Sequence, residues 1–171
     1  ILEMVKKHGI RPEEIQSVSL EACPMVMPML EHTDRNLRPQ DRQSCVFNVL
    51  WNAACALVRG QVTISEHDED ARNDPAIQAM ARRVHAVLRD DLTSTADPCA
   101  VTIITDRGTF TGTTVTPPGY FGRPIPEDLL LDKYLDCVAH ARKPYTHQQA
   151  IEFRELIGRL ESLADIRPVI D

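Results

Sequence analysis

The sequence predicts an α+β fold in which helices pack on a small, mainly antiparallel sheet. Segments with apolar residues at helical spacing stand at both ends of the chain, and a Thr-, Ile- and Val-rich region between them is typical of strands. The predicted order is helix, strand, two helices, hairpin and two more helices, which is not the regular alternation of a parallel α/β fold. With 171 residues, we expect a single domain spanning residues 1–171 that buries its own core.

The first predicted helix starts with the chain, in the segment ILEMVKKHG, and ends at Gly9. Because the chain opens without Met and already in helical spacing, we expect Ile1 to lie inside a longer polypeptide. A strand follows, with apolar positions at Ile15, Val18 and Leu20. The next apolar run is interrupted by proline, and a polar loop then extends over residues 31–43.

The stretch FNVLWNAACALVRG predicts a buried helix from about Ser44 to Arg59, ended by Gly60. One narrow polar seam runs along it, formed by Asn48 and Asn52, with the chain's only tryptophan, Trp51, at its edge. A buried amide without a partner costs about 1–3 kcal/mol, so the seam must face solvent, another polar segment or a ligand cleft. The residues leave open whether these amides are structural or line a substrate pocket.

After this helix, Asp74 and Pro75 predict the start of another helix, whose inner face is Ile77, Met80, Ala81 and Val84. The clearest strand signal is a hairpin over residues 99–115, with a turn at Asp106-Arg107-Gly108.

Two helices are predicted after the hairpin. A loop over residues 117–124 comes first, either a lid or interface loop or one packed on the domain's own sheet. The first helix then extends from about Pro126 to His140. The last starts after Thr146, which has capping-box spacing with Gln149, and carries its apolar stripe on to Ala164.

The composition excludes several classes of protein. Nineteen basic and 25 acidic residues give a net charge of −6, which argues against a nucleic-acid binder. No apolar run approaches the roughly 20 residues of a membrane span, so no membrane partner is expected. The five cysteines and six histidines show no metal-binding spacing. We therefore predict no metal site, reduced structural thiols and a cytoplasmic location.

The polar loop before the central helix holds three arginines, Arg35, Arg38 and Arg42. Planar guanidinium groups pair well with carboxylates, so one or more of them could orient an anionic substrate. The alternative is a solvated loop whose arginines form surface ion pairs.

Five segments, in this order, resemble the C-terminal part of the MmgE/PrpD family, which includes 2-methylcitrate dehydratase, cis-aconitate decarboxylase and iminodisuccinate epimerase. They are KKHGIRPEEIQSVSL, FNVLWNAACALVRG, NDPAIQAMARRVHAV, VTIITDRGTF and GYFGRPIPEDLLLDKY. The resemblance covers essentially the whole chain. It implies that this chain is an α+β C-terminal domain whose helical N-terminal domain is absent.

The resemblance implies lyase chemistry on small polycarboxylates, without a cofactor, in a homodimer. The family's main catalytic residues fall outside this chain, so we assign none here and expect the isolated chain to be inactive. Trp51 stands where many members have Tyr, so a hydroxyl is lost at that position. We predict that the substrate contacts Arg35, Arg38, Asn48, Trp51 and Asn52. Two alternatives remain open, a structural or dimerisation domain and an independent small binding protein.

Overall fold

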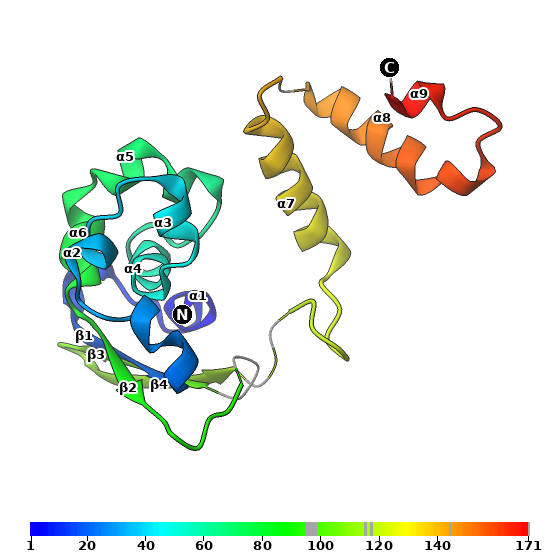
Figure 1. Ribbon diagram of the computed structural model, residues 1–171. Helices are drawn as coiled ribbons and strands as arrows, with labels where there is room; N and C mark the ends of the chain where they lie inside the picture. Colours follow the sequence, from blue (N-terminus) through cyan, green and yellow to red (C-terminus); the bar gives the residue numbers. More distant parts are fainter. Residues whose placement is uncertain (95–98, 115, 117, 144, 171) are drawn as a thin grey trace. The chain divides into compact units, whose positions relative to one another are not determined.

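A four-stranded mixed sheet in the order β2-β1-β3-β4 underlies the N-terminal part of the molecule (Figure 1). Strand β1 (Ile15–Ala22) pairs in parallel with β2 (Val84–Leu88) and antiparallel with β3 (Cys99–Thr105), which forms a hairpin with β4 (Gly108–Thr114). Two of the three strand pairs are antiparallel. The predicted α+β class, with helices on a mainly antiparallel sheet, is confirmed.

The computed structural model describes residues 1–94, 99–114, 116, 118–143 and 145–170. It divides into two compact units, residues 1–124 and residues 125–171. In these described ranges, no helix is both long enough and apolar enough to cross a membrane.

One face of the sheet is covered by three helices of the first unit (Figure 1): α1 (Leu2–His8), α4 (Val49–Arg59) and α6 (Pro75–Ala81). Short helical segments connect them and are, in chain order, η1 (Pro12–Glu14), η2 (Pro24–Met29), α2 (Asp34–Leu37), α3 (Arg42–Val46), η3 (Ile64–His67) and α5 (Glu69–Arg72). The predicted stops at Gly9 and Gly60 are confirmed, with φ values of 57° and 69°.

The core lies between this helical layer and the sheet. Val18 pairs with Val84 on one side and with Ile103 on the other, and all three side chains are fully buried. Leu50 and Leu57 of α4 belong to the same buried cluster, every member of which lies between Met4 and Ile103. The hydrophobic core of the first unit is therefore built entirely from its own residues.

The prediction of one continuous helix from Ser44 to Arg59 was wrong. The chain forms α3, breaks at Phe47 and Asn48, and starts again as α4. Asn48 has the extended backbone of an N-cap residue, and its Oδ1 accepts a hydrogen bond of 2.9 Å from Trp51 N–H. The break follows from this side chain, because asparagine satisfies free helix N–H groups better than it continues a helix.

Strand β2 was missed, since Val84 was assigned to the inner face of the preceding helix. That helix ends at Ala81, and Val84 instead pairs with Val18. The prediction failed because a five-residue strand carries little periodic signal, and its partner lies 66 positions earlier in the chain.

The second unit consists of α7 (Glu127–Ala139), α8 (His147–Gly158), η4 (Leu160–Ser162) and α9 (Arg167–Ile170). The capping box formed by Thr146 and Gln149 is confirmed. Tyr134 links the two longer helices, because its hydroxyl donates to the Ala150 carbonyl at 2.9 Å. The apolar stripe predicted to reach Ala164 extends beyond the helix, which ends at Gly158.

Candidate functional site

Trp51 lies in the core of the first unit. Its side chain is fully buried, and its indole Nε1 donates to the Glu66 carbonyl at 3.1 Å. The ring thus connects α4 to η3, and its single polar group is satisfied within the protein.

Asn48 is also buried, with 2% of its surface exposed. Besides capping α4, it donates from Nδ2 to the Asn36 carbonyl at 2.9 Å. At this end of α4, the polar seam faces the backbone of the preceding loop. The roles predicted for Asn48 and Trp51 in substrate binding stay predictions, and both side chains already have protein partners.

Asn52 is half-buried, and its amide joins α3 to η3. Nδ2 donates to the Cys45 carbonyl at 3.1 Å and to the Val46 carbonyl at 3.3 Å, and Oδ1 lies 2.9 Å from His67 Nε2. Because an amide oxygen can only accept, His67 carries a proton on Nε2. Burial lowers the pKa of His67, which favours the neutral imidazole.

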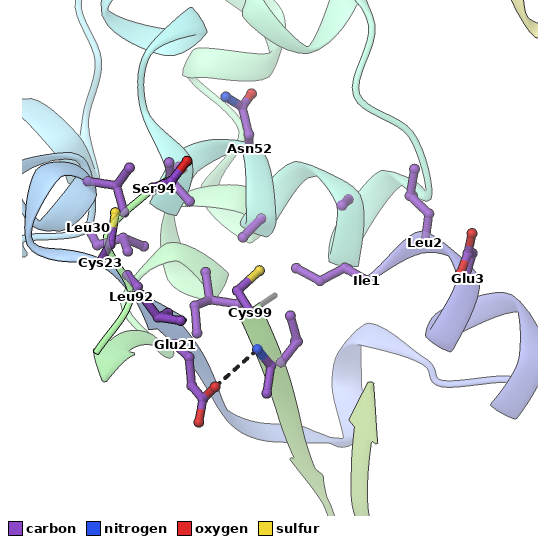
Figure 2. Close-up of a pocket in the computed structure, with 18 residues that line it drawn as sticks. Ile1, Leu2, Glu3, Glu21, Cys23, Leu30, Asn52, Leu92, Ser94 and Cys99 are labelled. Atoms are coloured by element: carbon purple, nitrogen blue, oxygen red, sulfur yellow. Dashed lines mark hydrogen bonds between the residues drawn. The ribbon is translucent and has the colours of Figure 1, made fainter. Parts of the chain in front are cut away.

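The same asparagine lines a cavity of about 580 Å³, shown in Figure 2. Its walls come from α1, β1, α4 and the start of β3, and they are mainly apolar. Its two acidic side chains are Glu3 and Glu21; Glu21 accepts from Ala100 N–H at 3.2 Å, the dashed line in Figure 2, and pairs with Arg89. No Lys, Arg or His is among the described residues of this wall. The cavity therefore suits an apolar group better than a polycarboxylate.

Arg35 lines a separate cavity of about 380 Å³, beside the break between α3 and α4. Its other polar side chains are uncharged and come from Thr33, Asn36, Gln43 and Ser44. Arg35 is exposed and forms no ion pair with any residue that the structure describes. An exposed guanidinium surrounded by hydroxyl and amide groups can bind a carboxylate through paired N–H donors.

Arg38 lies elsewhere, at a polar cavity of about 490 Å³ that it shares with Arg72. The third arginine of the loop, Arg42, forms an ion pair with Asp68. The structure thus gathers Asn48, Trp51 and Asn52 along α4 but separates Arg35 from Arg38.

Sequence reasoning missed Arg72. It ends the segment HDEDAR, which holds three acidic residues. An arginine just after Asp68, Glu69 and Asp70 suggests local ion pairs, and only the fold shows that Arg72 also faces the loop of Arg38.

The loop predicted to be a lid, an interface or a sheet contact begins at Pro117, which lies outside the described residues. Phe121 is 98% exposed, so its ring does not pack on the sheet, and Tyr120 is 57% exposed. The loop folds on itself, with Arg123 N–H donating to the Tyr120 carbonyl at 2.9 Å.

Comparison with known proteins bears on what these cavities serve. A search of curated proteins gives no match. The family model for the MmgE/PrpD C-terminal domain matches residues 1–158, which is nearly the whole chain and includes every element of the first unit. The chain therefore belongs to the MmgE/PrpD family, as a C-terminal domain.

Proposed function

We propose that this chain is the C-terminal domain of a cofactor-independent lyase that dehydrates, decarboxylates or epimerises small polycarboxylates such as 2-methylcitrate or cis-aconitate. In this proposal, Arg35 binds a substrate carboxylate and the catalytic groups belong to another part of the enzyme. The observation that carries the proposal is the exposed guanidinium of Arg35, which forms no ion pair with a described residue and lies in a cavity whose other described polar side chains are uncharged.

Three features support a polycarboxylate at this cavity. Its described lining contains no acidic side chain, and Asp41, whose charge acts on Arg35 from outside the lining, forms no ion pair with it. Thr33 adds a hydroxyl group that can donate to a carboxylate oxygen, whereas the Ser44 hydroxyl already donates to Asp41. Phe47, 65% exposed, adds an apolar surface for the carbon skeleton.

The cavity also lies next to the helix whose start Asn48 caps, and Asn48 holds the carbonyl of Asn36. Arg35 and Asn36 are neighbours in α2. The hydrogen bond therefore fixes the segment that carries Arg35, as a preorganised site requires.

A binding experiment on the full chain tests this proposal. Calorimetric titration with 2-methylcitrate and cis-aconitate should show weak binding, which Arg35→Gln reduces about tenfold or more because a charge-assisted bond is lost. Arg82→Gln is the matched control, since Arg82 is also exposed and also has no ion pair with a described residue. Equal affinities for wild type and R35Q would reject the site, and turnover by this chain alone would reject an external catalytic centre.

A second candidate, a homodimerisation domain, is favoured by one observation. Val46 and Phe47 are 50% and 65% exposed and stand side by side at the break between α3 and α4. Neighbouring large apolar side chains on a surface are typical of protein interfaces. Sedimentation of wild type and Phe47→Ser distinguishes the candidates, because only an interface role makes association depend on this ring.

A further inference from the structure

The cavity shared by Arg38 and Arg72 has no role in the proposed function. Its described lining is polar, with side-chain amides from Gln40, Asn73 and Gln78 and one carboxylate from Glu69. The described lining of this cavity holds two guanidinium groups and one carboxylate, in a protein of net charge −6. Within the cavity itself, this balance favours an anion.

Arg72 is fixed by its backbone and by one edge of its guanidinium. Its Nη1 donates to the Gln40 carbonyl, and its own carbonyl accepts from Gln78 Nε2 at 2.8 Å. This anchoring holds the side chain across the cavity without neutralising its charge.

The other edge of Arg72 is unused. Nε is buried and has no hydrogen-bond partner among the described residues, and Nη2 has none there either. Nε and Nη2 form the side of the guanidinium that binds two oxygens of one carboxylate or phosphate at once. A buried donor without a partner is costly, and an oxyanion bound along this edge would satisfy it.

Arg38 supplies a second charge from a loop of fixed shape. Gln40 Nε2 donates to the Arg38 carbonyl at 2.8 Å, and Gln40 in turn accepts from Arg72. Gln40 thus connects the two arginines through the backbone. Arg38 itself is exposed and has no ion pair with a described residue.

The acidic groups nearby form no ion pair with Arg38 or Arg72 among the described residues. Asp68 pairs with Arg42, and Asp41 caps α3 by accepting from Ser44 N–H at 2.7 Å, while its charge also acts on Arg72. Asp70 lines an adjacent cavity together with Arg72. Glu69 is the one carboxylate in the described lining, and it is exposed. Neither arginine is therefore held in a closed ion pair.

We infer that Arg38 and Arg72 form a binding site for an oxyanion with two or more negative charges, separate from the cavity of Arg35. The ligand is a phosphate group or a polycarboxylate, because both offer paired oxygens to Arg72 and further charge to Arg38. The amides of Gln40, Asn73 and Gln78 can hydrogen-bond the remaining oxygens.

Calorimetric titration of the full chain tests the inference, with inorganic phosphate as the first probe and ionic strength held constant with NaCl. We expect the wild type to bind one phosphate per chain. The Arg38→Gln and Arg72→Lys variants should each bind it at least about tenfold more weakly. Lysine keeps the charge of Arg72 but loses the two-donor edge. Arg82→Gln is the control for net charge and should bind like wild type.

Citrate is the second probe, titrated into the Arg35→Gln variant so that the Arg35 cavity does not contribute. Tighter binding of citrate than of phosphate assigns the site to polycarboxylates, and the reverse assigns it to phosphate groups. Phosphate binding that R35Q leaves unchanged supports this site even if the proposed function fails.

Three results would overturn the inference: no binding of either anion, wild-type affinity in R38Q, or an equal loss in R82Q. Because the Arg38 side chain forms no ion pair with a described residue, R38Q keeps the test valid if R72K fails to fold.

Discussion

Asn48 shows how one residue organises the region around the tryptophan. Its side chain starts α4 by accepting from Trp51 N–H and holds α2 by donating to the Asn36 carbonyl. Asn52, one turn later, joins α3 to His67. The amides in this apolar helix therefore connect it to its neighbours, and Asn48 also satisfies the buried N–H of Trp51.

Two substitutions of Asn48 distinguish how much each of its two hydrogen bonds contributes to stability. Asn48→Ala removes the cap and the bond to Asn36, and we expect it to lower the free energy of unfolding by about 1–2 kcal/mol. Asn48→Ser keeps an oxygen that can cap the helix, so we expect it to restore more than half of the free energy of unfolding that the Ala variant loses. Urea unfolding followed by Trp51 fluorescence measures both. Equal stabilities for the Ala variant and the wild type would show that the cap contributes nothing.

Two of the three buried thiols, Cys45 and Cys55, should not react with alkylating reagents. Burial raises the pKa of Cys45 to about 11 and that of Cys55 to about 12, and both are fully buried. At pH 8 we expect iodoacetamide to modify exposed Cys137 and leave these two unmodified, because the thiolate is the reacting form. Mass spectrometry of the digested protein gives the extent at each site, and alkylation of Cys55 at the rate of Cys137 would contradict the prediction.

The same shifts predict a loss of stability at high pH. A raised pKa in the folded state means that the neutral thiol is favoured in the native protein. The contribution of the two thiols to the free energy of unfolding is therefore constant below the pKa of an unfolded thiol, about 8.5. Above that pH, the unfolded state releases protons that the folded state keeps, and stability falls. Cys55→Ala should therefore show a shallower decline between pH 8.5 and pH 10 than the wild type.

At the scale of elements, local signals were reliable where a residue type has one strong preference. Gly9, Gly60, Asp74 and Thr146 end or begin helices as predicted. Strand β2 escaped prediction because its stability depends on pairing with a distant strand. The break before α4 escaped because Asn48 was counted as a polar position within a helix rather than as a cap.

The candidate sites were predictable only in part. Arg35 and Arg38 were recognised by residue type, and the fold was needed to show that they serve different cavities. Arg72 gave no signal, because its role depends on the contact with Gln40, 32 positions earlier. Sequence patterns identify side chains that can bind an anion, but long-range packing decides which of them share a site.

Glu66 fixes η3 against α4 and should make stability sensitive to acid. Burial alone would raise its pKa, but hydrogen bonds from Gln61 and Thr63, with the charge of Arg59, outweigh it and hold the pKa below the ordinary 4.5. The stabilisation is therefore present above pH 4.5 and is lost as the pH falls through the lowered folded pKa. Glu66→Gln should be less stable than the wild type at pH 6 and close to it at pH 3. Urea unfolding at both pH values measures this difference. A difference in free energy of unfolding that is the same at pH 6 and pH 3 would contradict the lowered pKa of Glu66.

At the scale of the whole molecule, the first unit has a buried core of its own. The buried cluster lies between Met4 and Ile103 and includes the fully buried row Val84–Val18–Ile103. The loop before the boundary at residues 124 and 125 exposes Phe121 almost completely and Tyr120 by more than half. We therefore expect the first unit to keep its fold when the chain is cut in this loop.

Chymotrypsin tests this directly, because it cleaves after aromatic residues and Phe121 is 98% exposed. Brief digestion should release an N-terminal fragment ending at Tyr120 or Phe121 that retains the buried Trp51 signal and melts within a few degrees of the intact chain. The double variant Tyr120→Ser, Phe121→Ser should resist this cut and is the matched control. A fragment that loses the tryptophan signal on cleavage would mean that residues 125–171 stabilise the sheet and its helices. Retention of both signal and melting temperature would instead assign the whole anion-binding machinery, Arg35, Arg38 and Arg72, to one autonomous folding unit.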